Sequence, residues 1–123
     1  ELSLRYCRVQ KNVEAEAESI LRGIDLWGYR NFSPYMLSQG QQRRLGVAVL
    51  MAYDCEVLIC DEPTYAQDRD NTVSIMEALV EKVKERGMTL IFSTHDRQLA
   101  IDYADVILQL KEGKLYEPSK SGL

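Results

Sequence analysis

The chain has 123 residues, of which 46% are hydrophobic and 28% are charged, a size and composition typical of one globular domain. Its formal net charge of −4 at pH 7 gives no general reason to expect nucleic acid as a direct partner. The longest apolar runs are far shorter than the roughly 20 residues that span a bilayer, so we expect membrane contact only through partner proteins.

The first part of the chain is predicted to be helical. Apolar residues recur with helical spacing over residues 13–26, and Asn12 is a candidate N-cap. A loop over residues 27–35 leads to a second helix over 38–53. Arg44 is expected off the buried face of that helix. The residues expected on the buried face are Leu45, Ala48, Val49 and Ala52.

After the second predicted helix the spacing of the hydrophobic residues changes. Short, continuous apolar runs over 56–60 and 88–93 indicate strands covered on both faces. Between them, residues 70–86 are predicted to form a helix that ends at Gly87. The residues expected to face inward from this helix are Val73, Met76, Leu79, Val80 and Val83.

The chain is predicted to end in a short helix and a hairpin. The helix begins near Asp96 and ends before Asp105, and the hairpin joins residues 106–110 to 114–116 through Glu112-Gly113. The order strand, helix, strand, helix, strand indicates an α/β fold with a parallel sheet, preceded by an all-helical region. Residues 118–123 are expected to be a loose tail.

Three cysteines are present, and this odd number favours reduced thiols in the cytosol over a disulfide framework. Cys55, Cys60 and His95 are the residues from which a metal site would have to be built. Their spacing matches no zinc pattern, so such a site is disfavoured.

Leu37-Ser38-Gln39-Gly40-Gln41 stands where the second helix is expected to begin. Backbone N–H groups without intrahelical acceptors and the positive end of the helix dipole make such a place an anion seat. Gly40 would let a phosphate approach closely. Considered alone, the segment is also compatible with an ordinary N-cap serine.

Asp61 and Glu62 follow directly on a predicted buried strand, and His95 follows the next one. Since neighbouring parallel strands end at one edge of a sheet, these side chains are expected to lie close together. Asp61 is a candidate Mg²⁺ ligand, through water, and Glu62 a candidate base for an attacking water. The alternatives are solvated strand-end acids and a structural histidine. Asp68 alone would be a helix cap or a solvated acid.

Together these segments resemble the ATP-binding cassette (ABC) family in order and spacing, over essentially the whole chain. The matching segments are Leu37 to Gln41 for the signature motif, Val57 to Glu62 for the Walker B strand, Ala66 to Asp68 for the D-loop, and His95 for the switch histidine. Gln39 and the run 61–68 are most similar to ATPases of energy-coupling factor importers. Departures are Ala66, where those importers more often carry Gly, and Val49, where many relatives carry Arg.

The resemblance implies a division of the chain into a helical signature subdomain over 1–53 and the C-terminal half of an incomplete RecA-like (P-loop NTPase) core over 54–117. It also implies a head-to-tail pair with a second ABC ATPase subunit. The residues implied to contact ATP held by that partner are Ser38, Gln39, Gly40 and Gln41. Asp61, Glu62 and His95 would serve ATP and Mg²⁺ in their own domain, and Asp68 would lie at the dimer seam.

The 123 residues contain no G-x-x-x-x-G-K-[ST] phosphate-binding loop, and no initiator Met. We therefore expect an excerpt or processed piece of a longer ATPase, with little activity alone and bared apolar sheet edges. The resemblance places the intact protein on the cytoplasmic face of the cell membrane, docked on integral transporter subunits. Two alternatives stay open: a split or degenerate binding module that gives only its signature segment in trans, and a non-transport ABC ATPase of DNA repair or translation.

Overall fold

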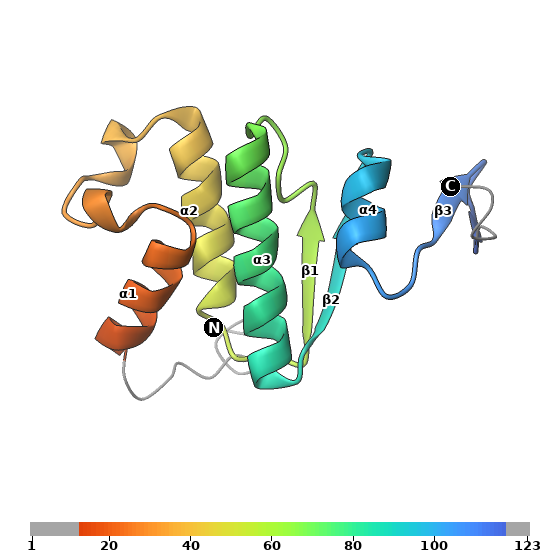
Figure 1. Cartoon of the computed structure of the whole chain (residues 1–123), viewed down its shortest axis with the longest axis horizontal. Coiled ribbons are helices and arrows are strands. Elements are labelled where there is room, and N and C mark those ends of the chain that lie inside the picture. Colours follow the sequence, from red (N-terminus) through yellow and green to blue (C-terminus); the bar gives the residue numbers. More distant parts are fainter. Residues whose placement is uncertain (1–12, 118–123) are drawn as a thin grey trace. The chain divides into compact units, whose positions relative to one another are not determined.

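The computed structural model describes residues 13–117, which form two compact units with a boundary between Ser93 and Thr94 (Figure 1). The expected N-cap Asn12 and the expected tail over 118–123 lie outside the described residues. Within 13–117, no helix combines the length and the apolar character that a bilayer crossing requires.

From Val13 to the first strand the chain is mainly helical, as predicted. This region consists of α1 (Val13–Gly23), the short 3-10 helices η2 (Trp27–Tyr29) and η3 (Pro34–Met36), and α2 (Gln39–Met51). Glu14 and Glu16 lie in the first turn of α1, where their negative charges interact favourably with the positive end of the helix dipole.

The strand–helix–strand unit is also confirmed. It consists of β1 (Val57–Asp61), α3 (Arg69–Arg86) and β2 (Thr89–Ser93). The two strands pair in parallel, from Val57 opposite Thr89 to Asp61 opposite Ser93. Helix α3 lies between α2 and this pair of strands (Figure 1). Gly87 ends α3 with a left-handed φ of 62°, a conformation that glycine adopts without penalty.

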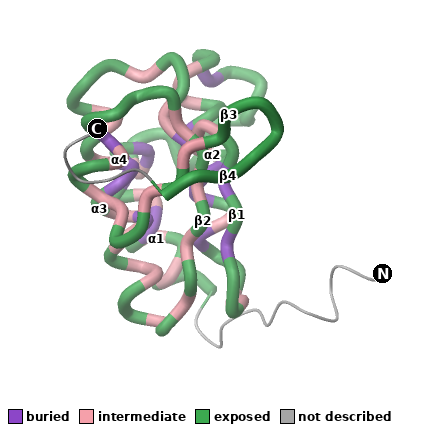
Figure 2. Tube along the Cα trace, turned by 90° about the vertical axis from the view of Figure 1, so that its right-hand side faces the viewer, coloured by how far each residue is buried: buried purple, intermediate pink, exposed green. Residues whose placement is uncertain are grey.

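The core of the first unit lies mainly among α1, α2 and α3; Figure 2 marks the buried positions in purple. Its largest fully buried side chains are Ile24, Leu26, Met51, Ile75, Met76 and Leu79. Burying several such side chains stabilises a fold by about 1.5–3 kcal/mol each, before the entropy of ordering the chain is subtracted.

The predicted buried face of α2 is confirmed at Ala48, which is buried, but it is wrong at other positions. Arg44 and Val47 are buried, whereas Val49 is 50% exposed and Ala52 is exposed. Helix α2 packs against both α1 and α3, so two neighbours rather than one apolar stripe decide which of its residues are covered. On α3 the prediction failed at Val73, which is 37% exposed, and it missed Ile75, which is fully buried.

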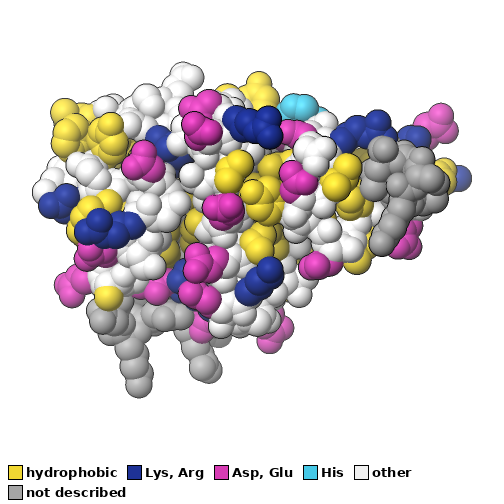
Figure 3. Space-filling model, viewed as in Figure 1, with side chains coloured by type: hydrophobic (Ala, Val, Ile, Leu, Met, Phe, Trp, Pro, Cys, Tyr) yellow, Lys and Arg dark blue, Asp and Glu magenta, His cyan; other side chains and the backbone are white. Residues whose placement is uncertain are grey.

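The strands are covered on one face, not on both as predicted. Leu58 and Cys60 are buried, whereas Ile59 is 70% exposed and Ile91 is 53% exposed. The parallel sheet has only two strands within the described residues, and α3 packs on it. The apolar side chains that point to the other face therefore stay in contact with water, and Figure 3 shows hydrophobic side chains at the surface of the face that it draws.

The second unit contains α4 (Arg97–Tyr103) and an antiparallel hairpin of β3 (Gln109–Lys111) and β4 (Lys114–Tyr116). The turn through Glu112 and Gly113 has positive φ angles of 49° and 74°, the conformation that suits a two-residue hairpin turn. The predicted hairpin is confirmed, although its first strand begins at Gln109 rather than at residue 106.

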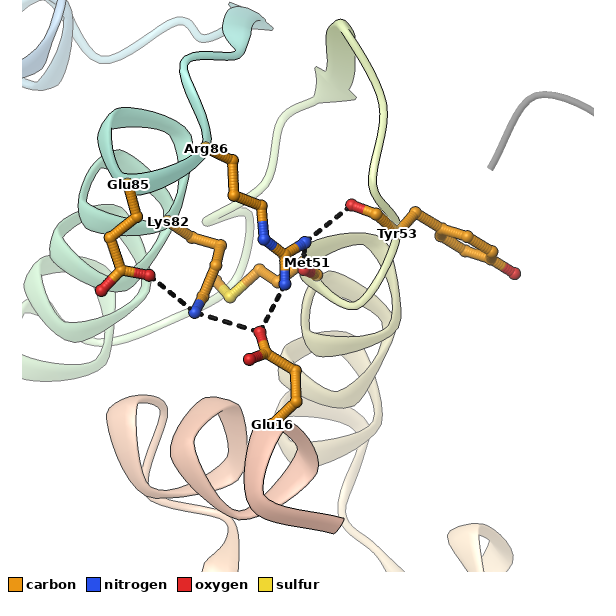
Figure 4. A network of polar contacts seen from close by, with 6 residues as sticks. All are labelled: Glu16, Met51, Tyr53, Lys82, Glu85 and Arg86. Atoms are coloured by element: carbon orange, nitrogen blue, oxygen red, sulfur yellow. Dashed lines mark hydrogen bonds and ion pairs between the residues drawn. The ribbon is translucent and has the colours of Figure 1, made fainter. Parts of the chain in front are cut away.

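A polar network joins the carboxyl end of α2 to α1 and α3 (Figure 4). Arg86 donates to the carbonyl oxygens of Met51 at 2.9 Å and Tyr53 at 2.8 Å, and it also pairs with Glu16. Lys82 lies 3.0 Å from the Glu16 carboxylate. Since the Arg86 side chain is 8% exposed, this guanidinium satisfies carbonyls at the helix end from a largely buried position.

Candidate functional site

The amino end of α2 carries the cap that the sequence predicted. Ser38 Oγ accepts a hydrogen bond from the Gln41 N–H at 3.3 Å, and Gln41 Oε1 accepts one from the Ser38 N–H at 2.9 Å. This reciprocal pair is a capping box, which fixes the first turn of the helix. Each of these two side chains is therefore held by the backbone N–H of the other residue.

The backbone N–H groups of Gln39 and Gly40 point out of the first turn and have no acceptor within α2, because helix geometry offers them none. Ser38 and Gln39 are exposed, and Gly40 is partly exposed. The first turn of α2 can therefore approach an anion with its N–H groups and with the positive end of the helix dipole.

The acid pair lies at the carboxyl end of β1, as predicted. Ser93, the last residue of the neighbouring strand, hydrogen-bonds through its hydroxyl to Asp61 Oδ1. The Glu62 N–H donates to the Ser93 hydroxyl at 3.1 Å and to the Ser93 carbonyl at 3.2 Å. One serine thus fixes the positions of both acids against the end of β2.

The donor set at Asp61 fits a magnesium ion. Asp61 is exposed, and only one of its carboxylate oxygens is bound to Ser93. Oxygen ligands from one or two carboxylates, completed by water and phosphate, are what Mg²⁺ prefers. Among residues 13–117, no group of three or more His, Cys, Asp or Glu side chains converges to form an all-protein metal site.

The loop between β1 and α3 has an unusual backbone at two positions. Glu62 has a φ of 48° and Ala66 a φ of 58°, both in the left-handed region that favours glycine. The loop turns through hydrogen bonds from the Tyr65 N–H to the Glu62 carbonyl and from the Gln67 N–H to the Thr64 carbonyl. The departure from glycine at Ala66 therefore falls where glycine would be conformationally less strained.

Asp68 is the N-cap of α3. Its carboxylate accepts hydrogen bonds from the Asn71 N–H at 2.8 Å and from the Asn71 side-chain amide at 2.7 Å. The backbone hydrogen bond from Asn71 is the main reason why the pKa of Asp68 lies below its ordinary value. The helix-cap interpretation of this residue is confirmed, and its place at a dimer seam stays a prediction.

The amino end of α2 contacts the segment from Tyr65 to Asn71. Gln67 Nε2 donates to the Gly40 carbonyl at 3.3 Å. The Arg43 guanidinium carbon lies 4.6 Å from the centre of the Tyr65 ring. Arg44 Nη1 donates to Asn71 Oδ1. The structure thus brings the predicted anion seat next to the loop that follows the acid pair.

His95 is exposed and belongs to the second unit, where Asp96 caps α4. Asp96 Oδ1 accepts hydrogen bonds from the N–H groups of Gln98 at 2.9 Å and Leu99 at 3.2 Å. The predicted proximity of His95 to the acid pair stays a prediction.

Sequence reasoning assigned no individual role to Ser93, Gln67 or Asn71, although Gln67 lies in the segment that resembles the D-loop. Each acts through a contact with a residue 27 to 32 positions away. The one local signal was the place of Ser93 at the end of a strand, next to residues that had been singled out.

The sequence pattern of the ABC transporter family matches residues 3–65 of the chain. The chain is 35% identical over 106 residues, 86% of its length, to the energy-coupling factor transporter ATP-binding protein EcfA of Methanocaldococcus jannaschii. It is also 35% identical over 106 residues, again 86% of its length, to the energy-coupling factor transporter ATP-binding protein EcfA2 of Methanospirillum hungatei.

Solved structures agree with these sequence matches. The chain superposes on cbiO1 of Clostridium perfringens, described as part of the ABC transporter complex cbiONQ, with a TM-score of 0.70 and 28% identity. That match covers 94% of this chain and 46% of the solved chain. The chain spans 38% of the length of EcfA and 26% of the length of EcfA2, well under half of each of these curated relatives.

Proposed function

The chain belongs to the ABC transporter family, and from this premise we propose that it forms part of an ATPase that hydrolyses ATP to drive membrane transport. The observation that carries the proposal is the contact between the capped tip of α2 and the loop that follows the acid pair. It joins the candidate anion seat to the loop beside the acid pair within one compact unit, and both are groups that can act on phosphates.

The tip of α2 would cover the phosphates of an ATP molecule held by a second ABC ATPase subunit. We assign this contact to Ser38, Gln39, Gly40 and Gln41. The N–H groups of Gln39 and Gly40 and the helix dipole supply the attraction, and the capping box keeps the turn in shape. At a hundredfold excess over its dissociation constant, a ligand that binds only the paired state favours pairing by roughly 2.7 kcal/mol.

The residues at the sheet edge would serve ATP bound to their own domain. Asp61 would hold Mg²⁺, which when bound neutralises charge on the phosphates. Glu62 would accept a proton from the attacking water, and His95 would contact the terminal phosphate. Asp68 would lie where the two subunits meet.

Uptake by an energy-coupling factor type importer is the transport process that we propose. Its support is the similarity to EcfA and EcfA2 and the resemblance of Gln39 and the run 61–68 to that subgroup. The ATPase would then lie on the cytoplasmic face of the membrane and touch the bilayer only through integral transporter subunits.

The phosphate-binding loop is the part of the machinery that these 123 residues do not contain. Without it, the backbone and lysine contacts to the β- and γ-phosphates are missing. We therefore propose that the 123 residues alone have little ATPase activity.

Phosphate release tests the proposal, measured with the chain alone and then mixed with an ABC ATPase polypeptide that carries the loop. The mixture should release phosphate, and Glu62→Gln should lower the rate by about 10²-fold or more. Ser38→Ala should also lower the rate, and its control Ser19→Ala, at an exposed position of α1, should leave the rate unchanged. Steady phosphate release by the chain alone, abolished by Glu62→Gln, would contradict the predicted inactivity.

The binding-module alternative is favoured by one observation: the α2 tip is complete, whereas the phosphate-binding loop is absent from these residues. In that case the mixture would depend on Ser38 and be indifferent to Glu62→Gln. The phosphate-release rates of the mixtures with the Ser38→Ala and Glu62→Gln variants therefore distinguish the two functions.

A further inference from the structure

The peptide that follows Gly40 is held by a side chain from outside α2. Gln67 Nε2 donates to the Gly40 carbonyl at 3.3 Å. A Cβ atom built on Gly40 would lie 3.6 Å and 3.7 Å from the two ends of the Gln67 amide, so this side chain lies directly against the glycine. Glycine has the widest backbone freedom of any residue, so an external hydrogen bond restricts it more than it would restrict another residue.

Gln67 is in turn connected to the acid pair through a short, turned backbone. Its N–H is bonded to the Thr64 carbonyl at 3.2 Å, and the Tyr65 N–H is bonded to the Glu62 carbonyl at 3.1 Å. The left-handed backbone of Glu62 and Ala66 shapes the same loop. A displacement of the Glu62 backbone should therefore also move the Gln67 side chain.

Neighbouring contacts support the same junction on either side. Arg43 lies over the Tyr65 ring at 4.6 Å, and the largely buried Arg44 donates to Asn71. Each of these contacts joins the first turns of α2 to the segment from Tyr65 to Asn71. Gln67 differs from them because it bonds the backbone of the anion seat itself.

We propose that Gln67 is a positioning residue: through its hydrogen bond to the Gly40 carbonyl it fixes the first turn of α2 for a phosphate. The same bond couples the acid pair of this chain to a nucleotide held by another polypeptide. This inference rests on the proposed function, because it presumes that the α2 tip binds ATP in trans.

The first test is steady-state ATP hydrolysis by the chain mixed with an ABC ATPase subunit that carries the phosphate-binding loop. Gln67→Leu keeps the approximate volume of the side chain and removes its donor. It should raise KM for ATP by about threefold to tenfold, the range that one net hydrogen bond provides, and change kcat by less than about twofold. The control Gln98→Leu removes the Gln98–Asp102 hydrogen bond on α4 and should change neither constant.

The second test uses the chain alone and needs no nucleotide. The Arg44 N–H shares the Gly40 carbonyl as its helical acceptor, so its hydrogen exchange should be about threefold to tenfold faster in Gln67→Leu. Gln67→Asn, which retains an amide, serves if the leucine variant does not fold, and should show the same direction.

The two experiments separate the inference from the function on which it rests. A wild-type mixture that releases no phosphate would refute the proposed function, and the exchange experiment would then decide the coupling. An unchanged KM in an active mixture, or unchanged exchange at Arg44, overturns the role of Gln67.

Discussion

The two ends of α2 are fastened to α3 in different ways. At the carboxyl end, Arg86 gives two hydrogen bonds to main-chain carbonyls and an ion pair to Glu16. At the amino end, Arg44 gives one hydrogen bond to Asn71, and within the described residues its buried Nε has no partner. The strongly held end carries no candidate site residue, whereas the weakly held end carries the predicted anion seat of Ser38 to Gln41.

This difference teaches how a single helix can serve stability and function at once. A charge held by several partners resists displacement, because moving it would leave a buried group without compensation. A contact made of single hydrogen bonds shifts at a cost of about 1 kcal/mol, which nucleotide binding can supply. Helix α2 is therefore expected to pivot about its carboxyl end.

The largest effect is expected from Arg86→Ala. It leaves the Met51 and Tyr53 carbonyls without their donor and Glu16 with Lys82 alone, and should lower the free energy of unfolding by about 3 kcal/mol. Urea unfolding at pH 7 measures the change. Arg22→Ala, which removes an exposed pair with Glu18, is the control and should cost about 0.5 kcal/mol. Equal losses in the two variants would break the comparison.

Arg44→Ala should have a smaller effect, about 1.5 kcal/mol, because only one hydrogen bond and the packing of the side-chain stem are lost. The same urea titration measures it. Arg43→Ala, in the adjacent and exposed position over Tyr65, should cost about 0.5 kcal/mol. A loss at Arg44 that matches the loss at Arg86 would mean that both ends are held equally.

The stability of the junction between the amino end of α2 and α3 is expected to depend on pH, partly through Asp68. Its pKa is lowered in the folded protein by the hydrogen bonds from Asn71. The stabilisation is therefore present above the unfolded pKa of about 3.9 and lost as the pH falls through the folded value. Asp68→Asn keeps a capping oxygen without the charge, so its urea midpoint should fall less between pH 5 and pH 3 than the wild-type midpoint. Parallel curves would contradict this.

The smallest effect, and the one of opposite sign, is expected from Ala66→Gly. The left-handed φ of 58° costs alanine about 1–2 kcal/mol, partly offset by the larger unfolded-state entropy of glycine. The net gain should be about 0.5 kcal/mol, measured by thermal unfolding. Ala78→Gly inside α3 provides the matched substitution and should destabilise the protein by about 1 kcal/mol.

Local chemistry made most of the fold predictable. The caps at Ser38 and Asp68, the stop at Gly87 and the turn at Glu112-Gly113 all follow from preferences that act within a few residues. The site residues on β1 and α2 were placed on the correct element ends for the same reason.

The errors arose where a distant neighbour decides the outcome. Val49 looked buried and Arg44 exposed, because helical periodicity does not reveal on which sides α1 and α3 pack. The hydrogen bond of Gln67 to Gly40 was out of reach for a similar reason, since its partners are separated by 27 residues. Side-chain contacts of this kind depend on tertiary structure.

The left-handed backbone at Glu62 imposes two demands on one residue, since the same position must supply a carboxylate and complete a tight bend. Glu62→Gln tests the first demand alone, because it removes the carboxylate and leaves the backbone conformation as restricted as before. A glycine there would abolish the carboxylate and relax the bend together, so an inactive glycine variant with raised thermal resistance would reveal conformational tension stored for catalysis.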